Sequence, residues 1–85
     1  MQIIYSPQFV KDYKKINEQT KRKAEAKENI LRNNPFDSRL KTHKLSGKFY
    51  DFWSFSVDYN CRIIFEFKNE KIVIFHAIGS HSIYK

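Results

Sequence analysis

The sequence predicts a small α+β protein with the element order β-α-α-β-β-β, in which an N-terminal helical hairpin packs on a small antiparallel sheet. In the first half of the chain, apolar residues recur at helical spacing. In the second half, three short segments rich in strand-forming residues are separated by polar turns. With 85 residues the chain has the length of one domain, so we expect a single domain over 1–85.

The N-terminal segment predicts a strand followed by a helix. Residues 2–5 are mostly apolar and form the opening strand. Ser6 and Pro7 are typical of a helix start, because serine caps the first turn and proline fits the first helical position. We therefore expect a helix from Pro7 to about Asn17, and its apolar residues follow helical spacing: Phe9, Tyr13 and Ile16.

A second helix is expected from Lys21 to Arg32. The polar residues 17–20 separate it from the first helix, and 33–35 (Asn-Asn-Pro) end it. Neither helix has a complete apolar face, so both must pack on another element. The apolar positions of the second helix are Ala24, Ala26, Ile30 and Leu31.

Three strands are expected over 49–57, 61–67 and 72–78, joined by turns at 58–60 and 68–71. Short turns between consecutive strands predict an antiparallel meander. One face then packs on the helices and the other is left for solvent or a ligand. The first face carries Trp53, Phe55, Cys61, Ile63, Phe65 and Phe67, and the second carries Ser54, Ser56, Asp58, Arg62, Ile64 and Glu66.

Composition excludes several protein classes. Hydrophobic residues make up 41% of the chain, which argues against intrinsic disorder. No apolar run approaches the length of a membrane span, and the N-terminus lacks the pattern of a signal peptide. A single cysteine, Cys61, excludes a disulfide framework and a zinc cluster, and we expect it to be a buried, inert thiol. We expect a cytoplasmic protein.

The net charge of +7 is concentrated in one stretch. Residues 11–48 hold twelve Lys or Arg and five Asp or Glu, whereas 49–85 hold four of each. Such a segment attracts phosphate backbones, acidic proteins or anionic membrane surfaces. A solvated helical face kept for solubility is the other interpretation.

Arg62 and the histidines are the candidates for chemistry. Arg62 lies on a strand, where a rigidly held guanidinium can bind a phosphate with two hydrogen bonds; an ion pair with Asp58 or Glu66 is the alternative. His43 precedes the meander and His81 follows it. We expect the start of the first strand and the end of the third at one end of the sheet, where two imidazoles and an arginine would suit phosphodiester cleavage.

The remaining candidates have weaker arguments. The alternative for His43 and His81 is that both are loop histidines that share no site. His76 lies inside the last strand and is expected to be structural. Tyr84 packs, stacks on a base or passes a proton as a catalytic residue. No set of metal ligands, phosphate-binding loop or nucleophile motif is present.

The sequence as a whole resembles the RelE/ParE superfamily of type II toxin–antitoxin toxins, and within it the RelE, YafQ and YoeB type of mRNA interferase. The resemblance covers nearly the whole chain, and it is the order and spacing of its segments that are specific. They are 5–13 (YSPQFVKDY), 43–47 (HKLSG), 52–57 (FWSFSV), 61–65 (CRIIF) and 78–81 (IGSH).

The resemblance implies a toxin that enters the ribosomal A site and cuts mRNA. The RNA 2′-hydroxyl attacks the adjacent phosphate, without a metal or a protein nucleophile, so no cofactor is expected. Arg62 resembles the arginine that stabilises the phosphate, His43 and His81 resemble active-site histidines, and Tyr84 a terminal aromatic residue. The chain departs from YafQ-like toxins at Ser56, where they carry histidine, and at Asn60, where they carry aspartate. We favour His43 as base and His81 as acid, and expect RNA contacts from Lys41, Lys44, Lys48 and Ser56.

The expected partners are an acidic antitoxin, the ribosome and its mRNA, and operator DNA only as a toxin–antitoxin complex; no membrane is expected. Two other functions remain open. ParE-type relatives share the fold and inhibit DNA gyrase without cutting RNA, although the presence of His43, Arg62 and His81 together argues against that branch. A small nucleic-acid-binding module would need only the basic helices.

Overall fold

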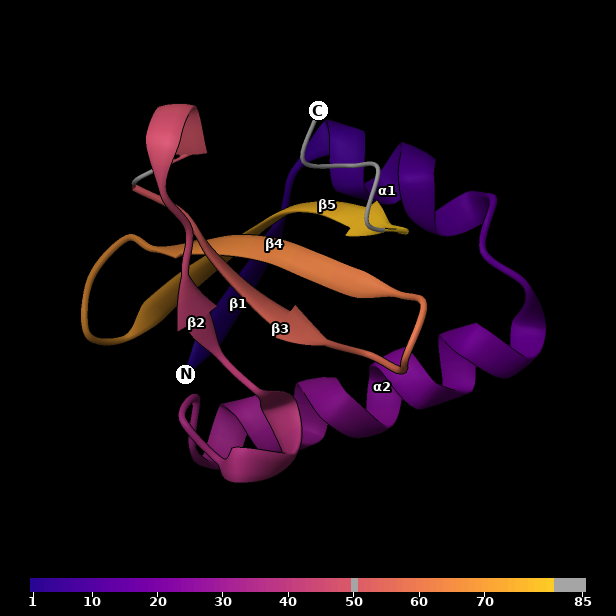
Figure 1. The fold of residues 1–85 in the computed structure, drawn as a ribbon, viewed down its shortest axis with the longest axis horizontal. Coiled ribbons are helices and arrows are strands. Elements are labelled where there is room, and N and C mark those ends of the chain that lie inside the picture. The colour runs from indigo at the N-terminus through magenta and orange to yellow at the C-terminus, as the bar shows by residue number, and fades with distance from the viewer. Residues whose placement is uncertain (50, 81–85) are drawn as a thin grey trace.

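The computed structural model describes residues 1–49 and 51–80, and within them two helices pack on a mixed five-stranded sheet (Figure 1). This confirms the predicted α+β class and the order of the main elements. The strand order across the sheet is β1-β5-β4-β3-β2. The elements are β1 (Gln2–Tyr5), α1 (Pro7–Lys14), α2 (Glu18–Asn33), β2 (His43–Lys44), β3 (Trp53–Ser56), β4 (Arg62–Phe67) and β5 (Ile72–Gly79), with short 3-10 turns at η1 (Ser38–Leu40) and η2 (Gly47–Phe49).

Helix α1 starts where the sequence predicts and ends three residues early. The Ser6 hydroxyl accepts a hydrogen bond from the backbone N–H of Phe9 at 3.0 Å and donates one to the carbonyl of His76 at 3.1 Å. It therefore caps the helix and ties its start to β5. The helix ends at Lys14, because the N–H of Lys15 and Ile16 turn back to carbonyls three residues earlier.

Helix α2 begins at Glu18, three residues before the predicted start. The side chain of Asn17 accepts a bond from the N–H of Thr20 at 2.8 Å, so Asn17 is the N-cap. The segment expected as a polar break is thus the cap and first turn of the helix. Ala24 and Leu31 are its buried residues, whereas Ala26 is exposed.

The edges of the sheet differ from the predicted meander. Strands β3, β4 and β5 pair antiparallel as expected, but β1 pairs with β5 in parallel, so the sheet is mixed. On the opposite edge β2 pairs antiparallel with β3. A two-residue strand has no detectable alternation, which is why the sequence did not predict it.

The hydrophobic core lies between the sheet and the helices. Phe9 of α1 packs against Phe75 of β5 with ring centroids 5.4 Å apart, and Phe55, Phe65 and Phe75 form mutual ring contacts below it. The three predicted core strands are present, but the first spans Trp53–Ser56 instead of 49–57, because Gly47–Phe49 form a 3-10 turn. Phe55 is fully buried and Trp53 is partly buried at the margin. The cluster comprises Ile3, Phe9, Ala24, Leu31, Leu40, Phe55, Val57, Cys61, Ile63, Phe65, Val73, Phe75 and Ile78.

Each helix contributes its own buried residues to this core, Phe9 from α1 and Ala24 and Leu31 from α2. In Figure 1 α1 lies at the top of the view and α2 at the bottom, with β4 and β5 running between them. None of the described helices is long and apolar enough to cross a membrane.

A β-bulge interrupts the pairing of β4 with β5. Ile64 is opposite Ala77 but Phe65 is opposite Phe75, so His76 is an extra residue on β5. Because of the bulge, Ile78 lies on the helix side opposite Ile63, whereas Ile74, four residues earlier, lies opposite Glu66 on the other side of the sheet.

We call the sheet surface opposite the helices the distal face. The sequence placed Ser54 and Ile64 on it as residues open to solvent or a ligand, but both are buried there, at 0% and 3% exposure. They lie on β3 and β4, each of which has a neighbouring strand on both sides. The distal face includes His43, Phe52, Ser54, Ser56, Arg62, Ile64, Glu66 and His76.

Candidate functional site

Two rows of paired residues on the distal face bring the predicted site residues together. Ser56 of β3 pairs with Arg62 of β4, and Arg62 pairs with Gly79 at the end of β5. The next row along the strands begins with His43 opposite Ser54. Paired residues project to the same side of a sheet, and the rows are about 7 Å apart. His43, Ser56 and Arg62 therefore share one surface.

The expectation that the start of the first meander strand and the end of the third lie at one end of the sheet is wrong. In an antiparallel meander the end of the third strand lies beside the end of the first strand, and Gly79 is accordingly in the row of Ser56. The start of β3 is at the other end. His43 reaches the site because the short edge strand β2 runs back along β3.

The imidazole of His43 is exposed and held by a local contact. Its Nδ1 lies 3.0 Å from the carbonyl oxygen of Lys41. A carbonyl only accepts, so Nδ1 carries the proton in this contact and Nε2 is the nitrogen that faces away from it. Lys41 adopts a left-handed backbone conformation with φ of 53°, which turns the chain into β2.

The carboxylates considered as ion-pair partners of Arg62 have other bonds. Asp58 accepts from the N–H of Asn60 and of Cys61, both at 2.8 Å, and thereby shapes the β3–β4 turn. It also lies 3.6 Å from Lys23 Nζ of α2. Glu66 bonds to His76. Arg62 is partly buried at the start of β4, and beside it Ser56 donates to the carbonyl of Asp58 at 2.8 Å.

The three lysines expected to contact RNA lie in different places. Lys41 is exposed in the segment just before β2, and Lys48 is exposed in η2. Lys44 pairs with Trp53, whose side chain packs toward the helix-side core, so Lys44 projects to the opposite side of the sheet from His43. Lys44 and His43 are therefore separated despite being neighbours in sequence.

His81 and Tyr84 lie outside the residues that the structure describes. The described chain reaches Ser80, one residue beyond the row of Ser56, Arg62 and Gly79. Their predicted catalytic roles remain predictions.

Cys61 is buried at 6% exposure, as predicted. Burial, with a smaller contribution from the Asp58 carboxylate, raises the pKa of its thiol to about 11. The thiolate is the reactive form of cysteine, so Cys61 is poorly suited to act as a nucleophile.

His76, expected to be structural, lies on the distal face in contact with two other side chains. Its Nε2 is 2.6 Å from Glu66 Oε1, and its ring stacks on Phe52 with centroids 4.7 Å apart. This pair could not be predicted from the sequence, because the bulge at His76 changes which side chains of β5 meet those of β4.

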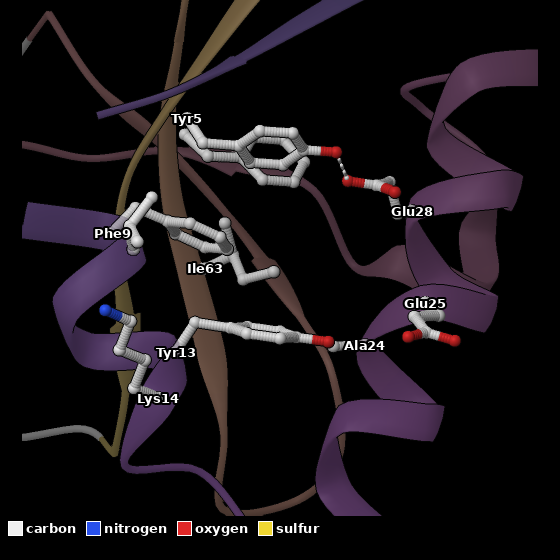
Figure 2. A pocket seen from close by; sticks show the side chains of 10 residues that line it. Tyr5, Phe9, Tyr13, Lys14, Ala24, Glu25, Glu28 and Ile63 are labelled. Atoms are coloured by element: carbon white, nitrogen blue, oxygen red, sulfur yellow. Dashed lines mark hydrogen bonds between the residues drawn. The ribbon is translucent and has the colours of Figure 1, made fainter. Parts of the chain in front are cut away.

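An apolar groove of about 410 Å³ lies on the other side of the sheet, between α1 and α2. Figure 2 shows the rings of Tyr5, Phe9 and Tyr13 along one wall and Glu25 and Glu28 on the opposite helix. The Tyr5 hydroxyl donates to Glu28 Oε1 at 2.5 Å across the groove. Burial, followed by this hydrogen bond, raises the pKa of Tyr5 to about 12. The lining suits an apolar side chain rather than a phosphate.

In the part of the chain that the structure describes, no three His, Cys, Asp or Glu residues are grouped so that they could hold a metal ion. The distal face offers a guanidinium, imidazoles, hydroxyls and the Glu66 carboxylate. These can bind a phosphate and transfer protons.

Comparison with known proteins identifies relatives of the whole chain. The model of the family described as bacterial toxin of type II toxin–antitoxin system, YafQ, matches residues 1–84. No relative was found among curated protein sequences.

Solved structures show the same fold. YafQ from E. coli strain BL21(DE3) superposes with a TM-score of 0.82 at 24% identity, covering 98% of this chain and 96% of that one. A YoeB/ParE toxin from Agrobacterium tumefaciens gives 0.81 at 15% identity, with 95% and 99% covered. The E. coli DinJ–YafQ toxin–antitoxin complex gives 0.78 at 24% identity, with 96% and 93% covered.

Proposed function

The chain belongs to the YafQ family of bacterial type II toxin–antitoxin toxins, and on this basis we propose that it is a ribosome-dependent endoribonuclease that cleaves mRNA in the A site. The observation that carries the proposal is the pairing register of the distal face. It aligns Ser56, Arg62 and Gly79 in one row and His43 in the next. A phosphate bound by Arg62 would thus have an imidazole within reach.

In the proposed reaction the 2′-hydroxyl of the RNA attacks the adjacent phosphate. The guanidinium of Arg62 stabilises the negative charge that builds up on the phosphate in the transition state. The histidines carry the protons, and the sequence favours His43 as base and His81 as acid. Tyr84 would stack on a base or pass a proton. Neither a metal ion nor a protein nucleophile is required for this chemistry.

Partners follow from charge and from the family. The excess positive charge of residues 11–48 would contact ribosomal RNA and would also attract an acidic antitoxin. The relative YafQ has been solved in complex with DinJ as a toxin–antitoxin pair. We propose a corresponding antitoxin for this chain, with operator DNA bound only by the complex, and action in the cytoplasm, where the ribosomes are.

Arg62→Ala tests the proposed function. We expect induced wild-type protein to arrest growth and to produce new mRNA 5′ ends in phase with codons. In Arg62→Ala the cleavage rate should fall about 100-fold or more, since loss of a group that stabilises transition-state charge has that effect. His43→Gln should also reduce cleavage.

Lys68→Ala is the control, because Lys68 is exposed in the β4–β5 turn at the opposite end of β4 from Arg62. Its cleavage should match the wild type. Growth arrest without new 5′ ends, unchanged in Arg62→Ala, would contradict the proposal and favour inhibition of DNA gyrase. Absence of growth arrest would favour a nucleic-acid-binding module.

A further inference from the structure

We propose that Phe36 stacks on an unpaired base of ribosomal RNA and that Lys44, beside it, binds the backbone of that RNA. The inference rests on the proposed function and adds a contact to it. Neither the family match nor the sequence pattern assigns a role to Phe36. Three observations support the proposal: a fixed and exposed ring, positive charge beside it, and a location on the other side of the sheet from Arg62.

Phe36 is the exposed member of an aromatic cluster. It is 58% exposed. Its ring lies 5.9 Å from the ring of Phe67 with 26° between the planes, and 5.5 Å from the ring of Trp53 at 74°. Trp53 and Phe67 are 5.4 Å apart and are partly buried against the core. We call these three rings the aromatic platform, and Phe36 is the ring that it presents to a partner.

The backbone around Phe36 is held by hydrogen bonds. The N–H of Phe36 donates to Asn34 Oδ1 at 3.0 Å, and the hydroxyl of Thr42 donates to the carbonyl of Pro35 at 2.5 Å. Leu40, in the turn η1 that follows, is fully buried. The ring is therefore fixed before a partner binds, which reduces the entropy lost on binding.

Positive charge lies beside the platform. Lys44 is exposed and pairs with Trp53, and the Cβ atoms of paired residues are about 5 Å apart, so Lys44 projects from the margin of the platform. Lys27 Nζ donates to the carbonyl of Arg39 at 3.0 Å. The carboxylate of Asp37 accepts two hydrogen bonds of 2.9 Å from the Arg39 guanidinium, so this pair adds no net charge. Lys27 and Lys44 therefore make the segment basic.

An exposed ring beside a lysine suits a nucleotide. A base stacks on an aromatic side chain while a cation binds the neighbouring phosphate, and this kind of contact does not require a particular sequence. An acidic protein segment would respond to the same charge, but its apolar side chains bind best in a concave surface. The apolar groove between α1 and α2 offers such a surface, and neither Phe36 nor Lys44 lines it. The platform therefore favours RNA.

The platform lies on the other side of the sheet from the proposed cleavage site. Trp53 packs toward the helix-side core, whereas Ser54, the next residue of β3, and Arg62 are on the distal face. An mRNA whose phosphate is bound by Arg62 would have to turn around the edge of the sheet to reach Phe36. Ribosomal RNA lines the A site and can contact this other side directly, so we assign the stacked base to ribosomal RNA.

Affinity for purified ribosomes that carry an mRNA tests the platform. Phe36→Leu removes the ring but keeps an apolar side chain, and it should lower the affinity about 10-fold, as expected for the loss of one stacked base. Phe36→Tyr keeps the ring and should bind as the wild type does. The single-turnover cleavage rate at saturating protein should be the same in all three, because Phe36 does not touch the mRNA.

Lys44→Gln tests the cation, and it does so even where Phe36→Leu fails to fold. The slope of log affinity against log salt should fall by about 1. Lys71→Gln, in the exposed β4–β5 turn, is the matched control and should keep the wild-type slope. Trp53 is the only tryptophan of the chain, so its fluorescence, measured with the melting temperature, reports whether the platform stays packed in each variant.

Photocrosslinking identifies the partner of the platform. A p-benzoylphenylalanine in place of Phe36 keeps an aromatic ring and reacts with its neighbours on irradiation. On ribosomes that carry an mRNA, it should crosslink to ribosomal RNA at a defined nucleotide. Crosslinks confined to the mRNA or to protein would overturn the proposal.

The outcomes separate this proposal from the proposed function. Unchanged ribosome affinity in Phe36→Leu, or an unchanged salt slope in Lys44→Gln, would overturn the role of the platform while leaving the nuclease in place. An equal loss of affinity in Phe36→Tyr would also overturn it, because the ring is kept in that variant. A wild-type protein that cuts no mRNA on ribosomes would instead refute the proposed function itself.

Discussion

Individual side chains in this protein have bonds that their residue types do not predict. Asp58 and Glu66 were both expected as possible partners of Arg62, but one shapes a turn and the other holds His76. Tyr5, in the first strand, reaches across the groove between the helices to Glu28. Each of these bonds joins residues whose contact depends on the arrangement of several elements.

Tyr5→Phe measures the bond across the groove. The pKa of Tyr5 is raised to about 12, so the folded state favours the neutral phenol. Its contribution to stability is therefore complete below about pH 10, the ordinary tyrosine value, and is lost as the pH rises to about 12. Because Tyr5 is 42% exposed, screening by solvent limits this contribution to about 1 kcal/mol.

We expect Tyr5→Phe to lower the free energy of unfolding by about 1 kcal/mol at pH 8, and the deficit to shrink as the pH approaches 12. Urea unfolding of both proteins at several pH values measures it. Tyr59→Phe is the control, since Tyr59 is 93% exposed. A deficit that is the same at every pH would show that the hydroxyl is not coupled to Glu28.

At the scale of elements, local capping and long-range pairing act together. Ser6 and Asn17 cap the two helices through bonds that short sequence patterns can encode. Ser6 additionally bonds to β5, seventy residues away in the chain. The short strand β2 has no such local signal, and its position depends on its pairing with β3.

Asn17→Ala tests whether the early start of α2 depends on its cap. Loss of the bond to the Thr20 N–H should destabilise the protein by about 1 kcal/mol, and the first turn of α2 should exchange its amide hydrogens faster. Asn29→Ala is the matched control, because Asn29 is exposed within α2 and alanine is the better helix former there. Equal stability of the two variants would contradict the role of the cap.

Across the whole molecule, the positive charge extends well beyond the proposed site. The excess charge belongs to residues 11–48, which include half of α1, all of α2 and the segment with His43, whereas Arg62 lies on the distal face of the sheet. The protein can therefore bind nucleic acid through one region and act on a phosphate with another.

The salt dependence of ribosome binding tests this division. Each lost phosphate contact should reduce the slope of log affinity against log salt by about 1. We expect the double variant Lys11→Gln/Arg22→Gln, on exposed positions of α1 and α2, to have a shallower slope. Lys68→Gln/Lys71→Gln removes the same charge from the β4–β5 turn and should leave the slope unchanged. Equal slopes for the two double variants would place the contact elsewhere.

The sequence by itself determined the fold class, the start of the first helix and the strands of the meander. Helix starts depend on a few adjacent residues, such as Ser6 and Pro7, and strands on a short-range alternation, so both can be inferred from local patterns. It also singled out His43 and Arg62, which the structure places on one face.

The tertiary structure decided the edges of the sheet, the bulge at His76 and the side to which Lys44 projects. These features depend on which distant strands pair and in what register. A shift of one residue in register exchanges the two faces of a strand, and a strand of two residues carries too few positions for a pattern. For the same physical reason the contact between His76 and Glu66 became apparent only once β4 and β5 were paired.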